Sequence, residues 1–288
     1  MKGAFTVKII VLSFIVLLII LASSFAAEIT AFAMPFYDLQ PKEIVLRAEF
    51  STDYSKSSTE RKHNISLAAK TLNGTFVDVG GEFSFNGTVG ARTEKRGYKR
   101  AKIIVNGEFV EGVGGGVCQV STTLYNAAVR AGLKLTEFHA HSLSFSYVSP
   151  SADAMVNSGS ADLRFINDTH NPVIIKATAN GSKLTVKIYG EPLQEKYELK
   201  SVIKSEIPPE YAVIKDTAGE YPDLYLGERR IIKNGKKGII SEGYIVKTLN
   251  GKVVSKTRVR RDRYLAIDGV IVEGTAILPD KTSEELAG

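Results

Sequence analysis

A run of glycines that leads directly into a helical pattern constrains this chain more than any other stretch. Four glycines stand between positions 112 and 116, and Cys118, the single cysteine of the chain, follows them. Glycine adopts backbone angles that a Cβ atom forbids and lets another segment approach closely. Small and apolar residues then recur at helical spacing up to Gly132, which suits a left-handed helix cap. We therefore expect a helix that starts at the cysteine.

The position of Cys118 in the first turn of such a helix would change its chemistry. The unpaired N–H groups and the dipole of a helix N-terminus favour an anion, so they lower the pKa of a thiol. The alternative is a packed core residue, because buried cysteines often behave as small inert apolar side chains. A free thiol in an exported protein favours the reactive interpretation.

The N-terminal segment indicates export. Lys2 and Lys8 flank a start without acidic residues, and an apolar run follows from position 9 to 22. Residues 1–34 are therefore predicted to be a signal peptide, cut near Ser24-Phe25-Ala26, or an uncleaved membrane anchor. The rest of the chain would work outside the cytoplasm. Its net charge of +6 then suits anionic envelope polymers, and nucleic acid is not an expected partner.

Turn residues divide the remaining chain into segments. A lead-in over 35–57 precedes an α+β domain with a mixed β-sheet and the cysteine helix over 58–192, and a small all-β module covers 193–275. A polar tail, 276–288, ends the chain. Leu143 to Tyr147 alternates as a half-buried strand should. The C-terminal module contains a hairpin with an Asn250-Gly251 turn. Its arginines (Arg258, Arg260, Arg261 and Arg263) predict a basic surface for attachment, with no catalytic residue.

Several segments together make residues 61–190 resemble a VanW domain, and the tail from about residue 195 resembles the small module named for its five glycines. The matching segments are Asn64-Ile65, Gly81-Glu-Phe-Ser-Phe-Asn86, Gly90-Ala-Arg-Thr93, Gly97-Tyr98, Gly114-Gly-Gly-Val-Cys-Gln-Val-Ser-Thr-Thr-Leu-Tyr-Asn126, His141-Ser142, Asp153-Ala154 and Asp162. The VanW family takes its name from glycopeptide-resistance gene clusters. Some members are regarded as cysteine-dependent L,D-transpeptidases, which build peptidoglycan cross-links in bacteria.

The resemblance implies that Cys118 is the nucleophile and that His141 is the histidine of the His-Ser motif. One departure is Phe138, where the family pattern has an arginine, and His139 is an additional imidazole. Acyl transfer also needs N–H donors for an oxyanion and a group that orients the base. Asp153 and Asp162 are both candidates for the orienting carboxylate. Candidates for oxyanion or substrate binding are Gly116, Gln119, Arg92, Ser142, Ser121 and Tyr98.

The leading hypothesis is a peptidoglycan L,D-transpeptidase that is membrane-anchored or secreted to the cell wall and acts on stem peptides through a thioacyl-enzyme. No metal or cofactor is expected, because no cluster has ligand spacing. One alternative is a non-catalytic wall-binding or glycopeptide-resistance accessory protein. Another is a cysteine carboxypeptidase or peptidase that uses water as the acceptor.

Overall fold

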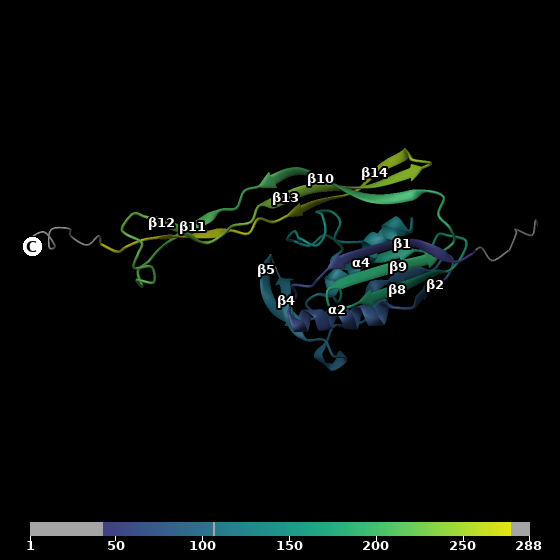
Figure 1. Ribbon diagram of the computed structural model, residues 1–288, viewed down its shortest axis with the longest axis horizontal. Helices are drawn as coiled ribbons and strands as arrows, with labels where there is room; N and C mark the ends of the chain where they lie inside the picture. Colours follow the sequence, from purple (N-terminus) through teal and green to yellow (C-terminus); the bar gives the residue numbers. More distant parts are fainter. Residues whose placement is uncertain (1–42, 106, 278–288) are drawn as a thin grey trace, which may run out of the picture. The chain divides into compact units, whose positions relative to one another are not determined.

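The computed structural model describes residues 43–105 and 107–277, which form a mostly β structure (Figure 1). The predicted signal peptide or anchor, and the start of the lead-in, lie outside these residues, as does most of the polar tail. Within the described part of the chain, no helix is long and apolar enough to span a bilayer.

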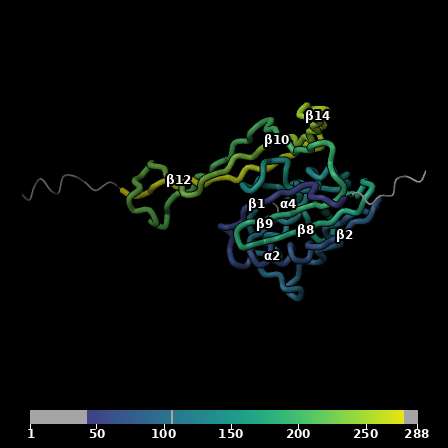
Figure 2. Tube along the Cα trace, turned by 45° about the vertical axis from the view of Figure 1, so that its right-hand side comes forward, coloured from purple at the N-terminus to yellow at the C-terminus, as the bar shows by residue number. Residues whose placement is uncertain are grey.

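The first segment of the described chain, from residue 43 to residue 190, is built on a four-stranded sheet. The strand order is β1 (Val45–Asp53), β9 (Lys183–Gly190), β8 (Val173–Ala179) and β2 (Thr75–Val77). Figures 1 and 2 show these strands side by side. All three pairings are antiparallel, so the mixed sheet expected from the sequence is wrong for this segment. The alternation of β9 buries one face, and its inward residues are Leu184, Val186 and Ile188.

Two helices contact the sheet and each other. Helix α2 (Thr59–Leu72) packs on β8, and its N-terminus is capped by the Ser58 hydroxyl, which accepts from the N–H of Arg61. Helix α4 (Val117–Arg130) packs on β1 and β9, and nearly all of its side chains are buried. A helix buried on all sides must satisfy its polar groups internally. Nε2 of Gln119 donates to the hydroxyl of Thr52 and the carbonyl of Asp53 on β1, while its Oε1 is buried without a partner among the described residues.

Shorter elements complete this segment. Strands β3 (Glu82–Ser84), β7 (Arg164–Ile166) and β6 (Lys134–Glu137) form a small sheet, in which the rings of Phe83 and Phe165 stack with centroids 4.7 Å apart. Between β3 and α4 come α3 (Phe85–Val89), the 3-10 turn η1 (Glu94–Arg96) and the β4–β5 hairpin. The hairpin strands are Arg100–Val105 and Glu108–Val113.

The segment from 138 to 163, between β6 and β7, contains no regular strand, so the strand predicted from Leu143 to Tyr147 is wrong. The alternating apolar residues of this segment pack against aromatic rings instead of forming a strand, because the ring of Phe145 contacts both His141 and Tyr147. A backbone carbonyl of this segment also contacts the C-terminal region: the carbonyl of Ser142 accepts a hydrogen bond from the N–H of Leu265.

The C-terminal region contains two three-stranded sheets. One has the order β10 (Lys196–Ile207), β13 (Gly238–Leu249) and β14 (Lys252–Tyr264), and its β13–β14 turn has positive φ at Asn250 and Gly251, as the sequence predicted for a hairpin. The other has the order β11 (Tyr211–Lys215), β15 (Gly269–Glu273) and β12 (Arg229–Lys233), and β11 and β15 run parallel. Contacts join the described residues from Glu43 onward into one compact unit.

Candidate functional site

The glycine run positions Cys118 at the start of α4. Gly116 has φ +107°, and a Cβ there would lie 2.9 Å from Cγ of Arg61 and 3.0 Å from Cγ1 of Ile65. Only glycine therefore suits both the backbone angle and the close approach of α2. The helix begins at Val117, which makes Cys118 its second residue. The thiol is half-buried and donates to the carbonyl oxygen of Val156 at 3.3 Å.

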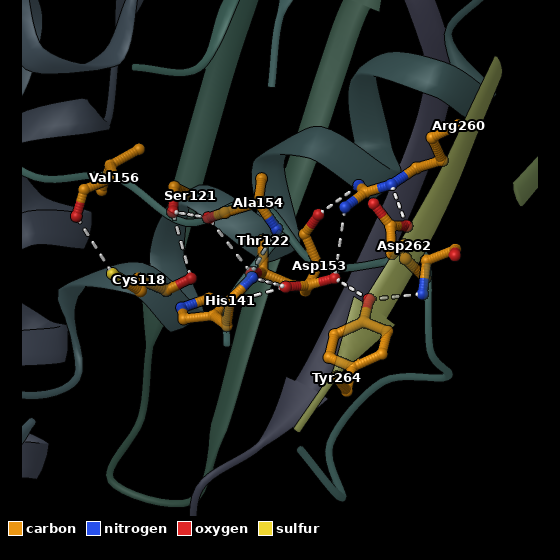
Figure 3. Close-up of polar contacts among 12 residues, drawn as sticks. Cys118, Ser121, Thr122, His141, Asp153, Ala154, Val156, Arg260, Asp262 and Tyr264 are labelled. Carbon is orange, nitrogen blue, oxygen red and sulfur yellow. Dashed lines mark hydrogen bonds and ion pairs between the residues drawn. The ribbon is translucent and has the colours of Figure 1, made fainter. Parts of the chain in front are cut away.

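His141 and Asp153 form a buried pair beside the thiol (Figure 3). Nδ1 of His141 lies 2.7 Å from Oδ2 of Asp153, and the backbone N–H of His141 donates to the same oxygen at 2.7 Å. Nε2 is buried and has no hydrogen-bond partner among the described residues. Because the carboxylate engages Nδ1, Nε2 is the nitrogen left to exchange a proton with Cys118.

The electrostatics of the three groups favour an ion pair. Burial raises the pKa of the Cys118 thiol, but His141 and Arg92 outweigh it and bring the pKa below its usual range. Burial likewise lowers the pKa of His141, yet Asp153 and Cys118 raise it to about 9. Burial would raise the pKa of Asp153, but the imidazole and Arg260 hold it low. The site therefore favours a thiolate at Cys118, an imidazolium at His141 and a carboxylate at Asp153.

Asp153 and Asp162, the two carboxylates that the sequence left open, lie in different places. Asp162 accepts from the hydroxyl of Ser84 and the N–H of Asn86, and it forms an ion pair with Arg164. It thus fixes the turn between β3 and α3, and no contact joins it to His141 in the described chain. Of the two carboxylates, Asp153 is the one that contacts the imidazole.

The two histidines also separate. Nε2 of His139 lies 2.9 Å from Oε1 of Glu137, and its side chain is 40% exposed. The shared strand parity that would bring both rings to one face is absent, because this segment is not a strand. Phe138 packs against Tyr125, and the guanidinium of Arg260 lies 5.4 Å over its ring. A guanidinium therefore lies beside position 138, but it comes from β14.

Two of the predicted substrate-binding residues lie at the site. Arg92 donates to the side chain of Asn86 at 2.7 Å through Nη1, while its Nη2 is buried without a partner among the described residues. The hydroxyl of Tyr98 is likewise buried and unpaired there, and burial raises its pKa. Arg92 is near enough to both Tyr98 and Cys118 to interact with them electrostatically. These atoms offer unused hydrogen bonds to a ligand.

The other predicted residues hold the scaffold. Ser121 donates to the carbonyl of Ala154 at 2.6 Å, which ties the Asp153 segment to α4. Gln119 binds β1, and Ser142 contributes its carbonyl to a contact with Leu265. Among the expected oxyanion donors, the N–H of Gln119 is already bound to the carbonyl of Gly116, and that of Val117 to Gly114. The N–H groups of Gly116 and Cys118 are the candidates that are left.

Four residues near the site escaped sequence reasoning. Arg61 and Tyr147 both interact electrostatically with Cys118. Arg260 and Tyr264 contact Asp153 from β14. The expectation that the C-terminal hairpin merely presents basic residues is wrong for Arg260, which is buried. The alternating Arg-x-Asp-x-Tyr pattern of β14 was the available signal, because it places three polar side chains on one face.

No group of His, Cys, Asp and Glu side chains in the described ranges is arranged to hold a metal ion. What the arrangement offers is a nucleophile, a base with an oriented ring, and unpaired polar groups beside them. This set can perform acyl transfer through a thioester.

Two regions of the chain match known protein families. Residues 60–189 match the family described as VanW like protein, and residues 198–276 match the G5 domain, so the resemblance noted from the sequence is confirmed. YoaR, an uncharacterized protein of Bacillus subtilis (strain 168), is 45% identical over 141 residues, which cover 49% of this chain and 46% of YoaR.

Further similarities include a second curated relative and a solved G5 domain. The vancomycin B-type resistance protein VanW of Enterococcus faecalis (strain ATCC 700802 / V583) is 29% identical over 134 residues, 44% of this chain and 48% of that protein. The chain therefore spans about half the length of the curated relatives it matches. A solved G5 domain of an IgA1 protease is 21% identical with a TM-score of 0.20, covering 28% of this chain and 90% of the domain.

Proposed function

We propose that this chain, which carries a VanW-like domain followed by a G5 domain, is a cell-wall-associated L,D-transpeptidase with Cys118 as its nucleophile. The observation that carries the proposal is the spatial arrangement of the half-buried Cys118 beside the buried pair of His141 and Asp153. Nδ1 of the imidazole is 2.7 Å from the carboxylate, and Nε2 remains for the thiol. The same three functions, nucleophile, base and orienting acid, serve acyl transfer on unrelated folds.

The reaction has two steps. The Cys118 thiolate attacks the carbonyl carbon of the L-centre that precedes the terminal D-residue of one stem peptide. The bond to the D-amino acid breaks, and its nitrogen takes a proton from the His141 imidazolium. An amine of a second stem then attacks the thioester, His141 accepts the amine proton, and the thiolate is released. N–H groups at Gly116 and Cys118 would stabilise the oxyanion in both steps.

Arg92 gives the site a preference for an acidic substrate. Its unpaired Nη2 lies in a buried position, and Arg61 supplies a second guanidinium close enough to interact with the thiol. A guanidinium pairs with a carboxylate through two parallel hydrogen bonds. We assign to Arg92 the terminal carboxylate of the D-residue that leaves in the first step.

The test is product analysis on purified tetrapeptide muropeptides. A transpeptidase yields dimers with an equal release of D-amino acid, and Cys118→Ala abolishes both. Trimmed stems without dimers would mean that water is the acceptor and would leave a carboxypeptidase. Unaltered substrate, with binding to isolated cell walls that Cys118→Ala retains, would establish the non-catalytic wall-binding alternative and overturn the proposal.

The role of Arg92 has its own comparison. Arg92→Lys keeps the charge but loses the planar fork, so we expect KM for tetrapeptide stems to rise roughly tenfold with a smaller change in kcat. Arg100→Gln is the matched control, because Arg100 is exposed on β4 and its guanidinium donates to the carbonyl of Glu111, away from the site. An unchanged KM in Arg92→Lys, together with a raised KM in Arg100→Gln, would show that general positive charge, and not the fork of Arg92, attracts the substrate.

A further inference from the structure

The segment that carries His141 and Asp153 lies between α4 on one side and the C-terminal sheet on the other. On the α4 side, Thr122 accepts from the N–H of Ala154, and Asn126 donates to the carbonyl of Ala152 at 2.6 Å. The contacts on the other side come from β13 and β14. The hydroxyls of Ser151 and Ser241 are 2.7 Å apart, and both residues are fully buried.

Asp153 divides its two carboxylate oxygens between His141 and β14, as Figure 3 shows. Oδ2 accepts both hydrogen bonds from His141. Oδ1 accepts from the hydroxyl of Tyr264 at 2.6 Å, and Nη2 of Arg260 lies 3.5 Å from it. Nη1 of Arg260 donates to the backbone carbonyl of Asp153 at 2.6 Å. Residues of β14 thus hold Asp153 both at its backbone carbonyl and at its side-chain carboxylate.

These partners are themselves fixed. Nε of Arg260 donates to Asp262 at 2.6 Å, and the Tyr264 hydroxyl accepts from the N–H of Ser151 at 2.7 Å. Tyr264 is 1% exposed, and the side chains of Arg260 and Asp153 are 4% and 3% exposed. Groups that are buried and fully hydrogen-bonded cannot rotate without leaving a partner unsatisfied. The plane of the Asp153 carboxylate, and with it the direction of the His141 ring, is therefore set partly from β14.

We propose that Tyr264 and Arg260 are positioning residues for the Cys118–His141–Asp153 group, so that the C-terminal G5 region completes the reactive site of the VanW-like domain. The inference rests on the proposed function, because it gives these residues a role in acyl transfer. It changes the part expected of the C-terminal region, which the sequence suggested was limited to attachment. The two residues act through Asp153 and touch no reacting atom.

Two effects of losing the Tyr264 hydroxyl have opposite signs. If the hydroxyl only withdrew charge from the carboxylate, its removal would strengthen the bond to the imidazolium and lower the apparent pKa of Cys118. If it positions the carboxylate, its removal frees the side chain to turn away, weakens the imidazolium and raises that pKa. The other charged and titratable groups around the site stay unchanged in either case. Arg61, Arg92 and Tyr147 interact with the thiol. Tyr98 interacts with Arg92, and Tyr125 and Asp262 interact with Arg260.

The experiment is a double-mutant cycle in the full chain, read by the pH dependence of Cys118 alkylation with iodoacetamide. Tyr264→Phe is expected to lower the alkylation rate at pH 7 roughly threefold to tenfold and to shift its midpoint to higher pH. In an Asp153→Asn background, Tyr264→Phe should have no further effect, because the residue acts through the carboxylate. Arg260→Lys, which keeps the charge but not the fork, should behave in the same way.

Tyr244→Phe is the matched control. Tyr244 lies on β13, and its hydroxyl binds Glu242 at 2.7 Å, with no contact to the segment from 138 to 163 in the described hydrogen bonds. A fall or no change in the midpoint with Tyr264→Phe would overturn the inference, and so would an undiminished effect in the Asp153→Asn background. Failure of the proposed function looks different. In that case the wild-type chain itself forms no dimers from stem peptides, whatever Tyr264→Phe does.

Discussion

Removal of the His141 ring is the most direct perturbation of the site. The pKa of His141 is raised from 6.5 to about 9, which corresponds to about 3 kcal/mol of imidazolium stabilisation by its neighbours. If the thiolate supplies about half of this energy, His141→Ala lifts the apparent pKa of Cys118 by about one pH unit. Burial, which raises the pKa of the thiol, then acts with less opposition. Only the thiolate is nucleophilic, so alkylation at pH 7 should fall about tenfold.

The assay is the rate of iodoacetamide labelling between pH 5 and pH 10, followed by intact mass, with His139→Ala as the control. His139 is only two residues from His141 in the sequence, but its ring binds Glu137 at the surface. Its loss should therefore leave the pH dependence of labelling nearly unchanged. A larger shift in His139→Ala would mean that the base has been assigned to the wrong ring. If neither variant changes the profile, the helix N-terminus alone activates the thiol, and the ion-pair argument is refuted.

Three further outcomes follow from the packing and the charges. Gly116→Ala should lower stability by about 1–3 kcal/mol in thermal melts, because its Cβ would meet Arg61 and Ile65 at a positive φ. Phe165→Ala should cost about 3–5 kcal/mol in urea denaturation, since Phe165 is fully buried and stacked in the small sheet. The raised pKa of His141 stabilises the fold below pH 6.5, and this contribution disappears as the pH rises through about 9. Urea titrations of the chain with Cys118 intact should show that loss with pH, and His141→Gln should remove it.

The sequence predicted the elements whose signals are local. The glycine run and helical spacing located α4, which begins at Val117, and the Asn250-Gly251 pair marked the β13–β14 turn. Each of these signals depends on residues within a few positions of one another. Cys118 and His141 were identified through the family resemblance as well as through their chemistry.

What the sequence left open depends on distant contacts. Asp153 and Asp162 are both buried acids, and only the fold shows which of them meets the imidazole. The alternation of Leu143 to Tyr147 predicted a strand, but aromatic packing and contacts to the C-terminal region replace sheet pairing there. Arg260 looked like one of several basic surface residues. A period-2 pattern predicts which residues share one face of a strand, but it does not predict which segment packs against that face.

The spacing of the Asp153 contacts along the chain has a consequence for the order in which the protein is made. Arg260 and Tyr264 lie 107 and 111 residues after Asp153. A chain under synthesis therefore holds Cys118, His141 and Asp153 well before the groups that fix the carboxylate exist. Contacts of such long range form late, because closing a long loop costs entropy before any contact rewards it. The thiol thus reaches its final electrostatic environment only in the finished, folded molecule.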